Sequence, residues 1–154
     1  DTLKWVTTNS ENYWLVHTDM RPRNFAYQDG KVMHFDFDDI CHHWFMYDIA
    51  VAALHETENW ANTAERSEFI KTFLSDFLIW YSQEKIISKE MLNLLILFMK
   101  LRCIYAYIDY YKRLRIKKVD SWKDKMSIRR WYILDFDSFI STTDIELFIK
   151  WLYA

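Results

Sequence analysis

The sequence predicts a mainly α-helical domain of the α+β class that carries one small β-hairpin. Its 154 residues include eight tryptophans and one glycine, which favours packed helices with few special turns. Hydrophobic residues make up 51% and aromatic residues 19%, enough to build the core of a single domain spanning 1–154. Asp29-Gly30 is a typical two-residue turn between two strand-like runs, and it predicts the hairpin.

The first half of the chain is expected to contain short strands and then helices. We predict a strand at 14–17, a hairpin with strands at 25–28 and 31–35, and an acidic, histidine-containing loop at 36–44. The first helix is predicted from about Trp44 to about His55.

Helices are expected through the second half of the chain. Asn62-Thr-Ala-Glu65 resembles a capping box, and the apolar residues after it follow helical spacing to about Gln83. Three more helices are predicted from candidate capping residues: one from Ser88 through Arg113, one from Asp120, and a last one from the box Thr143-Asp-Ile-Glu146.

One motif carries the chemistry. His17-Thr-Asp19-Met-Arg-Pro-Arg-Asn24 has the spacing H-x-D-x-x-x-x-N of a kinase catalytic loop, in which the Asp faces the acceptor hydroxyl and the Asn binds Mg²⁺. Asp36 follows the hairpin, which would fold the chain back and bring this carboxylate beside Asn24. We therefore expect Asp19 to be the base, with Asn24 and Asp36 as Mg²⁺ ligands that also bind ATP or another nucleoside triphosphate.

Two further residues are candidates for the same site. Arg21 follows Asp19 by two positions, so its guanidinium can reach the transferring phosphate and offset charge there. Asp38 is a weaker candidate for the metal shell, since Asp38 and Asp39 can instead cap the following turn.

Three linked segments resemble the aminoglycoside phosphotransferase family: Leu15 to Asn24, Val32 to Asp39 and Trp44 to Ala50. That family is related to choline kinase and homoserine kinase-like enzymes, and it has a protein-kinase-like fold. Its usual pattern is H-G-D-L-H-P-G-N, then D-F-D-D, then Y-D-[IL]-A. This chain departs from the pattern in its first motif, where Thr18, Arg21 and Arg23 replace Gly, His and Gly.

The resemblance implies a cytoplasmic phosphotransferase that moves the γ-phosphoryl group of ATP to the hydroxyl of a small-molecule acceptor. It also implies that His17 anchors the loop and that Asp48 hydrogen-bonds the loop's backbone amides, both as structural support for Asp19. Only sixteen residues precede His17, and Gly30 is the sole glycine. We therefore expect the C-terminal, catalytic-loop lobe of such an enzyme, without the N-terminal lobe that clamps the nucleotide.

Other interpretations are weighed against this one. A non-catalytic interaction domain is the alternative, because surface left uncovered by the other lobe would favour a homo-oligomer. Cys41-His42-His43 lacks the spacing of a zinc site. The basic run from Lys112 to Lys118 is expected to be a solvated surface, with binding of an anionic partner as a minor alternative.

Bulk properties exclude other classes. The net charge of −2 argues against a nucleic-acid partner, and two cysteines give no disulfide framework, as suits a reducing cytoplasm. The longest apolar run, Leu94 to Met99, is far too short to span a membrane.

Overall fold

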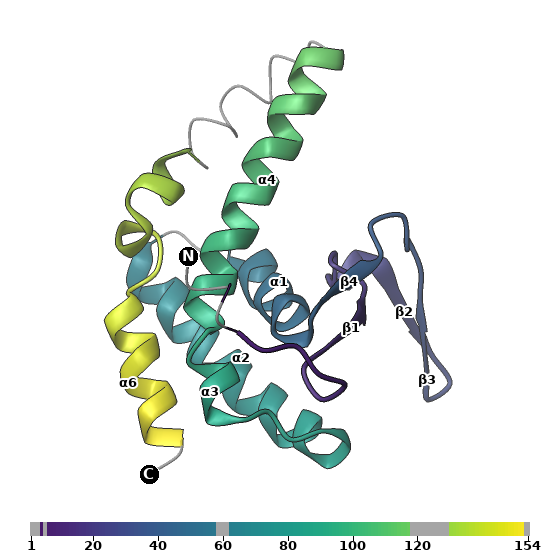
Figure 1. Ribbon diagram of the computed structural model, residues 1–154, viewed down its shortest axis with the longest axis vertical. Coiled ribbons are helices and arrows are strands. Elements are labelled where there is room, and N and C mark those ends of the chain that lie inside the picture. The colour runs from purple at the N-terminus through teal and green to yellow at the C-terminus, as the bar shows by residue number, and fades with distance from the viewer. Residues whose placement is uncertain (1–3, 5, 58–61, 118–129, 153–154) are drawn as a thin grey trace.

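The computed structural model describes residues 4, 6–57, 62–117 and 130–152. Helices form the main body, and a thin hairpin projects from one side of it (Figure 1). The prediction of a mainly helical α+β fold with a small hairpin is confirmed. Residues 130–134 are helical, and the other elements in chain order are β1 (Tyr13–Val16), η2 (Pro22–Asn24), β2 (Phe25–Gln28), β3 (Lys31–His34), β4 (Cys41–Trp44), α1 (Phe45–Thr57), α2 (Thr63–Glu84), α3 (Lys89–Leu92), α4 (Leu95–Lys117), η3 (Phe136–Ser138) and α6 (Thr142–Leu152).

Within the described ranges, the strands form two antiparallel pairs. Strands β2 and β3 make the predicted hairpin, and both Asp29 and Gly30 have left-handed backbones, with φ of 51° and 75°, as a tight two-residue hairpin turn requires. Strands β1 and β4 pair in a register that sets Val16 opposite Cys41. The prediction of a loop throughout 36–44 is therefore wrong over its last four residues. They extend because β1 offers them a partner strand, which lies too far back in the sequence for a local pattern to reveal.

The helices confirm some boundaries and correct others. Helix α2 begins as predicted, since the side chain of Asn62 accepts a hydrogen bond from the Glu65 amide at 3.0 Å. The single helix predicted from Ser88 is wrong, because Ser88 caps only the short α3 and the chain turns before α4 begins. Helix α6 is capped by Ser141, whose hydroxyl accepts from the Asp144 amide, so the box predicted at Thr143 is also misplaced. The helix predicted from position 120 falls outside the described residues.

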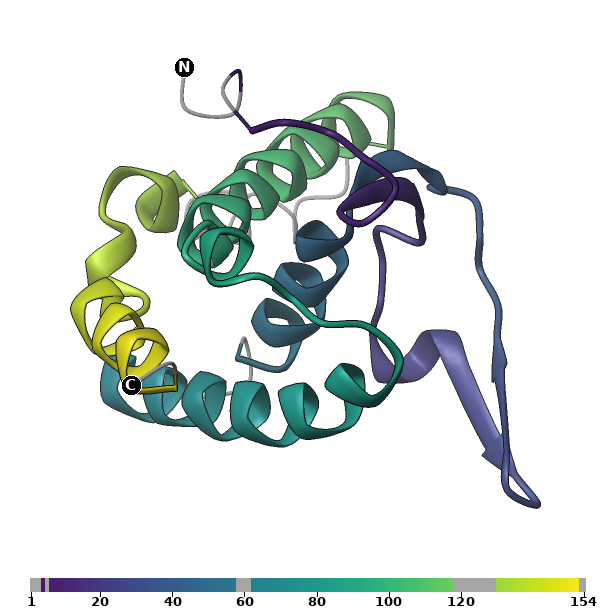
Figure 2. The same ribbon diagram turned by 60° about the horizontal axis from the view of Figure 1, so that its bottom comes forward.

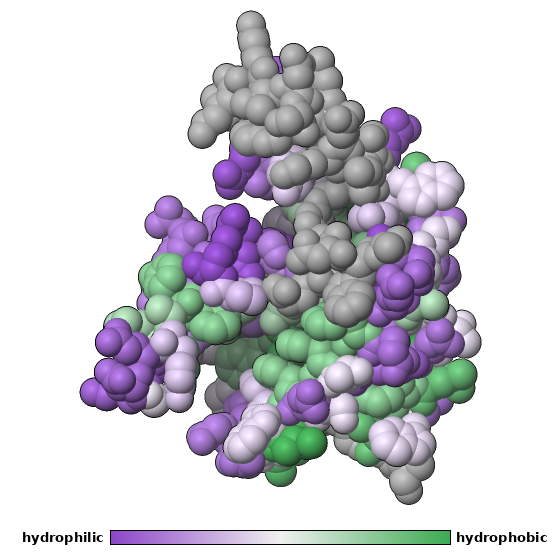
Figure 3. Space-filling model, turned by 180° about the vertical axis from the view of Figure 1, so that it is seen from behind, coloured by the Kyte–Doolittle hydropathy of each residue, from purple (hydrophilic) through white to green (hydrophobic). Residues whose placement is uncertain are grey.

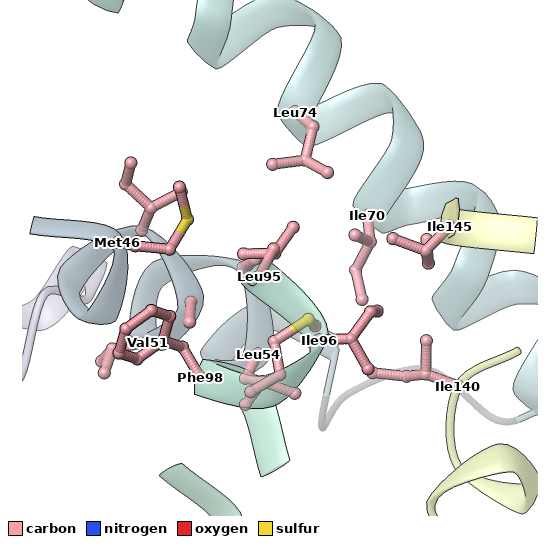
Figure 4. Packing of buried hydrophobic residues seen from close by; sticks show 14 of the residues in the cluster. Met46, Val51, Leu54, Ile70, Leu74, Leu95, Ile96, Phe98, Ile140 and Ile145 are labelled. Atoms are coloured by element: carbon pink, nitrogen blue, oxygen red, sulfur yellow. The ribbon is translucent and has the colours of Figure 1, made fainter. Parts of the chain in front are cut away.

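The hydrophobic core lies between the helices. Helix α4 packs along α1, α1 packs on α2, and α2 packs on α6. Labelled side chains of α1 and α4 lie together, and Ile70 and Leu74 of α2 and Ile145 of α6 lie towards the other side of the view (Figure 4). The largest side chains of this core that are fully buried include Met46, Ile70, Leu74, Leu95, Phe98, Met99, Ile140, Ile145 and Ile149. This rigid packing fixes α1 and α4, the two helices that approach the catalytic motif.

Two views agree that the hairpin stands clear of the helices (Figures 1 and 2). From behind, apolar residues gather over the lower part of the helical body among polar ones (Figure 3). Of the helices that the structure describes, none combines the length and apolar composition that a membrane crossing needs.

Candidate active site

The loop after β1 is fixed by the first turn of helix α1. The carboxylate of Asp48 accepts hydrogen bonds from the backbone amides of His17, at 2.8 Å, and Thr18, at 2.7 Å. These are the two bonds that the family resemblance implies for Asp48. The positive end of the α1 dipole favours a carboxylate at this position. The first helix therefore sets the backbone from which Asp19 projects.

Thr18 occupies a backbone conformation that suits glycine. Its φ is 64°, in the left-handed region where a β-branched residue is strained. Its amide donates to Asp48, and its hydroxyl donates to the backbone carbonyl of Asp39 at 2.9 Å. The family pattern has glycine here, which adopts a positive φ without strain, and the two bonds hold the threonine in this conformation.

Asp19 is surrounded by donors. It is only 7% exposed, and its Oδ2 pairs with the Arg21 guanidinium and accepts from Asn24 Nδ2 at 2.8 Å. Its Oδ1 pairs with Nη2 of Arg102, on α4, at 3.2 Å. The second guanidinium nitrogen of Arg102 donates to the Thr18 carbonyl at 3.3 Å. The buried carboxylate is thus contacted by two cations and one amide.

Asn24 and Asp36 are brought together by the hairpin. The Phe35 amide donates to the Asn24 carbonyl at 3.0 Å, and β2 and β3 pair from Phe25 opposite His34, so Asp36 follows directly at the open end of the hairpin. Nε2 of His17 also bonds to the Phe35 carbonyl at 3.0 Å, which ties this end of the hairpin to the catalytic loop.

The oxygen ligands at this end of the hairpin suit a hard cation. Both contacts of the Asn24 side chain are made through Nδ2, so within the described residues its Oδ1 accepts no hydrogen bond. Asp36 and Asp38 are exposed. An amide oxygen and carboxylates are the oxygen ligands that Mg²⁺ prefers. Within the described ranges, no three His, Cys, Asp or Glu side chains cluster as a ready-made metal site, so an ion here would need other ligands, such as phosphate oxygens, to complete its shell.

A cavity of about 630 Å³ opens beside Asp19. Its wall is formed by the catalytic loop, β4, α1 and α4, and includes Thr18, Asp19, Arg21, Arg23, Tyr47, His55, Arg102, Tyr105, Asp109, Tyr110, Lys112 and Arg113. Asn24, Asp36 and Asp38 are not among the lining residues. Asp19 therefore lines the cavity and also contacts Asn24, which lies next to the open end of the hairpin.

Burial shifts the pKa of several titratable groups near the loop. It raises the pKa of Asp48, although the amides of His17 and Thr18 oppose the shift. It also lowers the pKa of His43 and raises the pKa of Tyr47.

Two residues of the site are absent from the sequence predictions. Arg102 reaches Asp19 from α4, and Nε2 of His55 lies 3.1 Å from Nη1 of Arg21. Both stand in helices with ordinary spacing and belong to no motif, so only the packing of α1 and α4 on the loop reveals them. A basic residue between the half-buried Leu101 and the buried Cys103 is the one local signal for Arg102.

The basic run and the cysteine-histidine run are also placed by the structure. Lys112 and Arg113 line the cavity, while the side chains after Arg115 in this run lie outside the described residues. Cys41, His42 and His43 follow one another in β4, where successive side chains point to opposite faces.

Comparison with known proteins gives the family. The model of the phosphotransferase enzyme family matches residues 3–83. Amicoumacin kinase of Bacillus subtilis (strain 168) is 30% identical over 108 residues, which cover 68% of this chain and 32% of that protein. The solved structure of amicoumacin kinase hAmiN in complex with AMP-PNP, Ca²⁺ and Ami matches with a TM-score of 0.78 and 25% identity, over 95% of this chain and 44% of that one. The chain thus spans less than half the length of these relatives. It belongs to the phosphotransferase enzyme family.

Proposed function

We propose that this chain is the catalytic-loop lobe of an ATP-dependent phosphotransferase, a small-molecule kinase, and that a nucleotide-clamping lobe completes its site. The observation that carries the proposal is that the buried Asp19 lines the cavity and also contacts Asn24, whose backbone bonds to Phe35 next to Asp36. A base that touches an acceptor pocket on one side and a metal-nucleotide site on the other suits phosphoryl transfer, in which positioning and charge neutralisation do most of the work.

The residues take the roles that the sequence predicts. Asp19 accepts the proton of the acceptor hydroxyl, and Arg21 neutralises charge on the transferring phosphoryl group. Asn24 and Asp36 hold Mg²⁺, with Asp38 as a further candidate ligand. When bound, Mg²⁺ would offset the negative charge of the β- and γ-phosphates. His17 and Asp48 support the loop without touching the reactants.

The acceptor is proposed to be a small molecule that carries a hydroxyl group. The cavity beside Asp19 has about 630 Å³, within the range of pockets that hold such ligands. Both relatives are amicoumacin kinases, so amicoumacin is the first acceptor to test.

The test is a calorimetric titration of the complete gene product with AMP-PNP, with and without Mg²⁺, followed by turnover assays with ATP and amicoumacin. We expect Mg²⁺-dependent binding that Asp36→Asn weakens by at least about tenfold, since a carboxylate ligand is lost. Asp19→Asn should keep the binding and lower turnover by about 10²- to 10⁴-fold.

The control for these variants is Asp29→Asn. Asp29 is an exposed aspartate with positive φ in the same hairpin, and an Asn-Gly turn suits the hairpin equally well. Normal binding and turnover in Asp36→Asn and Asp19→Asn would contradict the assigned roles.

A non-catalytic interaction or oligomerisation domain is the second candidate. The observation that favours it is a group of exposed apolar side chains on the strands and the loop after them: Trp14, Leu15, Phe25, Tyr27, Val32, Met33, Phe35, Phe37 and Ile40. Absence of nucleotide binding, together with a light-scattering mass that is a multiple of one chain, would favour this candidate over the kinase.

A further inference from the structure

The two carboxylate oxygens of Asp19 have different partners. Oδ2 pairs with Arg21 and accepts from Asn24, whereas Oδ1 has Arg102 as its sole partner among the residues that the structure describes. In the proposed function, Arg21 contacts the transferring phosphoryl group and Asn24 binds the metal. Arg102 takes part in neither of these tasks; beyond the loop it acts on the nearby Tyr47 hydroxyl, whose pKa it lowers against the effect of burial.

Arg102 is built as a fixed support. It lies in α4 three residues after the fully buried Met99 and one before the buried Cys103, so the core anchors its backbone. Its guanidinium spans two acceptors of the catalytic loop, the Thr18 carbonyl at 3.3 Å and Asp19 Oδ1 at 3.2 Å. Two parallel contacts fix the plane of a guanidinium as well as its distance.

Arg21 is held differently. It precedes the short helix η2, and its other contact is a side chain, His55, rather than the loop backbone. Its nearest carboxylate neighbour is Oδ2 of Asp19, the oxygen that also accepts from Asn24. Movement of Arg21 towards a phosphate and of Asn24 towards a metal would free this oxygen and leave Oδ1 paired.

We propose that Arg102 is the positioning residue of the reaction: it holds Oδ1 of Asp19 so that Oδ2 is the oxygen that takes the proton. This inference rests on the proposed function. In the step, Oδ2 binds the proton of the acceptor hydroxyl, and the acceptor oxygen forms its bond to the γ-phosphorus of ATP. The bond from that phosphorus to the β,γ-bridging oxygen breaks, its electron pair leaves with ADP, and Asp19 later releases the proton to water.

A purely structural ion pair would give the same contacts, so the test must separate the two roles. A positioning residue acts on the proton-transfer geometry and should change kcat while leaving the KM for ATP near its wild-type value. A structural residue should instead lower thermal stability and the fraction of active protein, without response to an added cation.

The experiment uses the complete enzyme with ATP and an acceptor on which the wild type turns over. Arg102→Met should lower kcat by about 10- to 100-fold with the KM for ATP changed by less than about threefold, a loss typical of misplaced catalytic groups. In Arg102→Ala, methylguanidinium added to the assay should restore part of kcat. Arg102→Gln is the second variant, because it keeps a polar hydrogen-bond donor at this position while lacking the charge that pairs with Asp19.

Lys100→Met is the matched control. Lys100 is an exposed cation of the same helix, and its ammonium lies 5.3 Å from the centre of the Phe136 ring, on a contact outside the site. Its removal should leave kcat unchanged.

The outcomes separate the two proposals. Wild-type kcat in folded Arg102→Met or Arg102→Gln would overturn this inference and leave the kinase assignment standing. A loss of kcat that methylguanidinium does not relieve, with a matching loss of folded protein, would also overturn it. A wild-type enzyme that transfers no phosphoryl group to any hydroxyl acceptor would contradict the proposed function itself, and this inference would fall with it.

Discussion

Replacing Asp48 by alanine removes the acceptor that holds the catalytic loop. The carboxylate accepts from the amides of His17 and Thr18 at 2.8 and 2.7 Å, and both of those residues are only 7% exposed. A buried donor left without a partner costs about 1–3 kcal/mol, so two cost about 2–6 kcal/mol. The variant also avoids the free-energy cost of burying the carboxylate, which offsets part of this loss. We therefore expect Asp48→Ala to lower the free energy of unfolding by about 2–4 kcal/mol.

Urea unfolding, followed by far-UV circular dichroism, measures this loss. With a urea slope of about 2 kcal/mol/M, the midpoint should fall by about 1–2 M. Hydrogen exchange of the His17 and Thr18 amides should accelerate in the same variant. The control is Asp76→Ala, which removes an exposed aspartate of α2 and should change stability by less than about 0.5 kcal/mol. An Asp48→Ala midpoint within that control's range would refute the reasoning that the carboxylate supports the loop.

Two further predictions concern the core and the pH dependence. Phe98→Ala empties a fully buried site of α4 and should cost about 3–5 kcal/mol in urea unfolding, and a loss near that of an exposed substitution would contradict the described core. Burial raises the pKa of Asp48 above its ordinary value of 3.8, so the folded state binds this proton more tightly than the unfolded state does. The stability that comes from this group is present below pH 3.8 and is lost as the pH rises through the folded pKa. The side chain in Asp48→Asn cannot titrate, so this variant should lose more stability in acid than at neutral pH. Urea titrations at a series of pH values measure the difference. A loss of stability that grows as the pH rises would contradict the raised pKa.

Local sequence patterns predicted the features that local chemistry determines. The Asp29-Gly30 turn and the Asn62 cap depend on a few adjacent residues, and both occur where the sequence placed them. The motif from His17 to Asn24 likewise has its side chains together in one loop. The residues that determine such features lie within a few positions of them in the chain.

The features that the sequence did not reveal depend on distant partners. Strand β4 exists because β1 pairs with it, and its residues carry no pattern that excludes a loop. The break between α3 and α4 separates two runs that a helical pattern joins, since Leu92 and Leu95 are both fully buried. Arg102 enters the site only through the packing of α4. In each case tertiary contacts, rather than the local sequence pattern, determine the structure.

The bonds that shape the catalytic loop also have a consequence for the order of folding. Asp48 and Arg102 follow Thr18 in the chain by 30 and 84 residues, and closing such segments costs entropy that local contacts do not repay. Within the described residues, the bonds that hold the strained Thr18 come from Asp39 and Asp48, 21 and 30 positions away. We therefore expect the loop to acquire its final shape only after α1 and α4 have docked. On this expectation the candidate site forms late, and an intact site would report that the helices beneath it are packed.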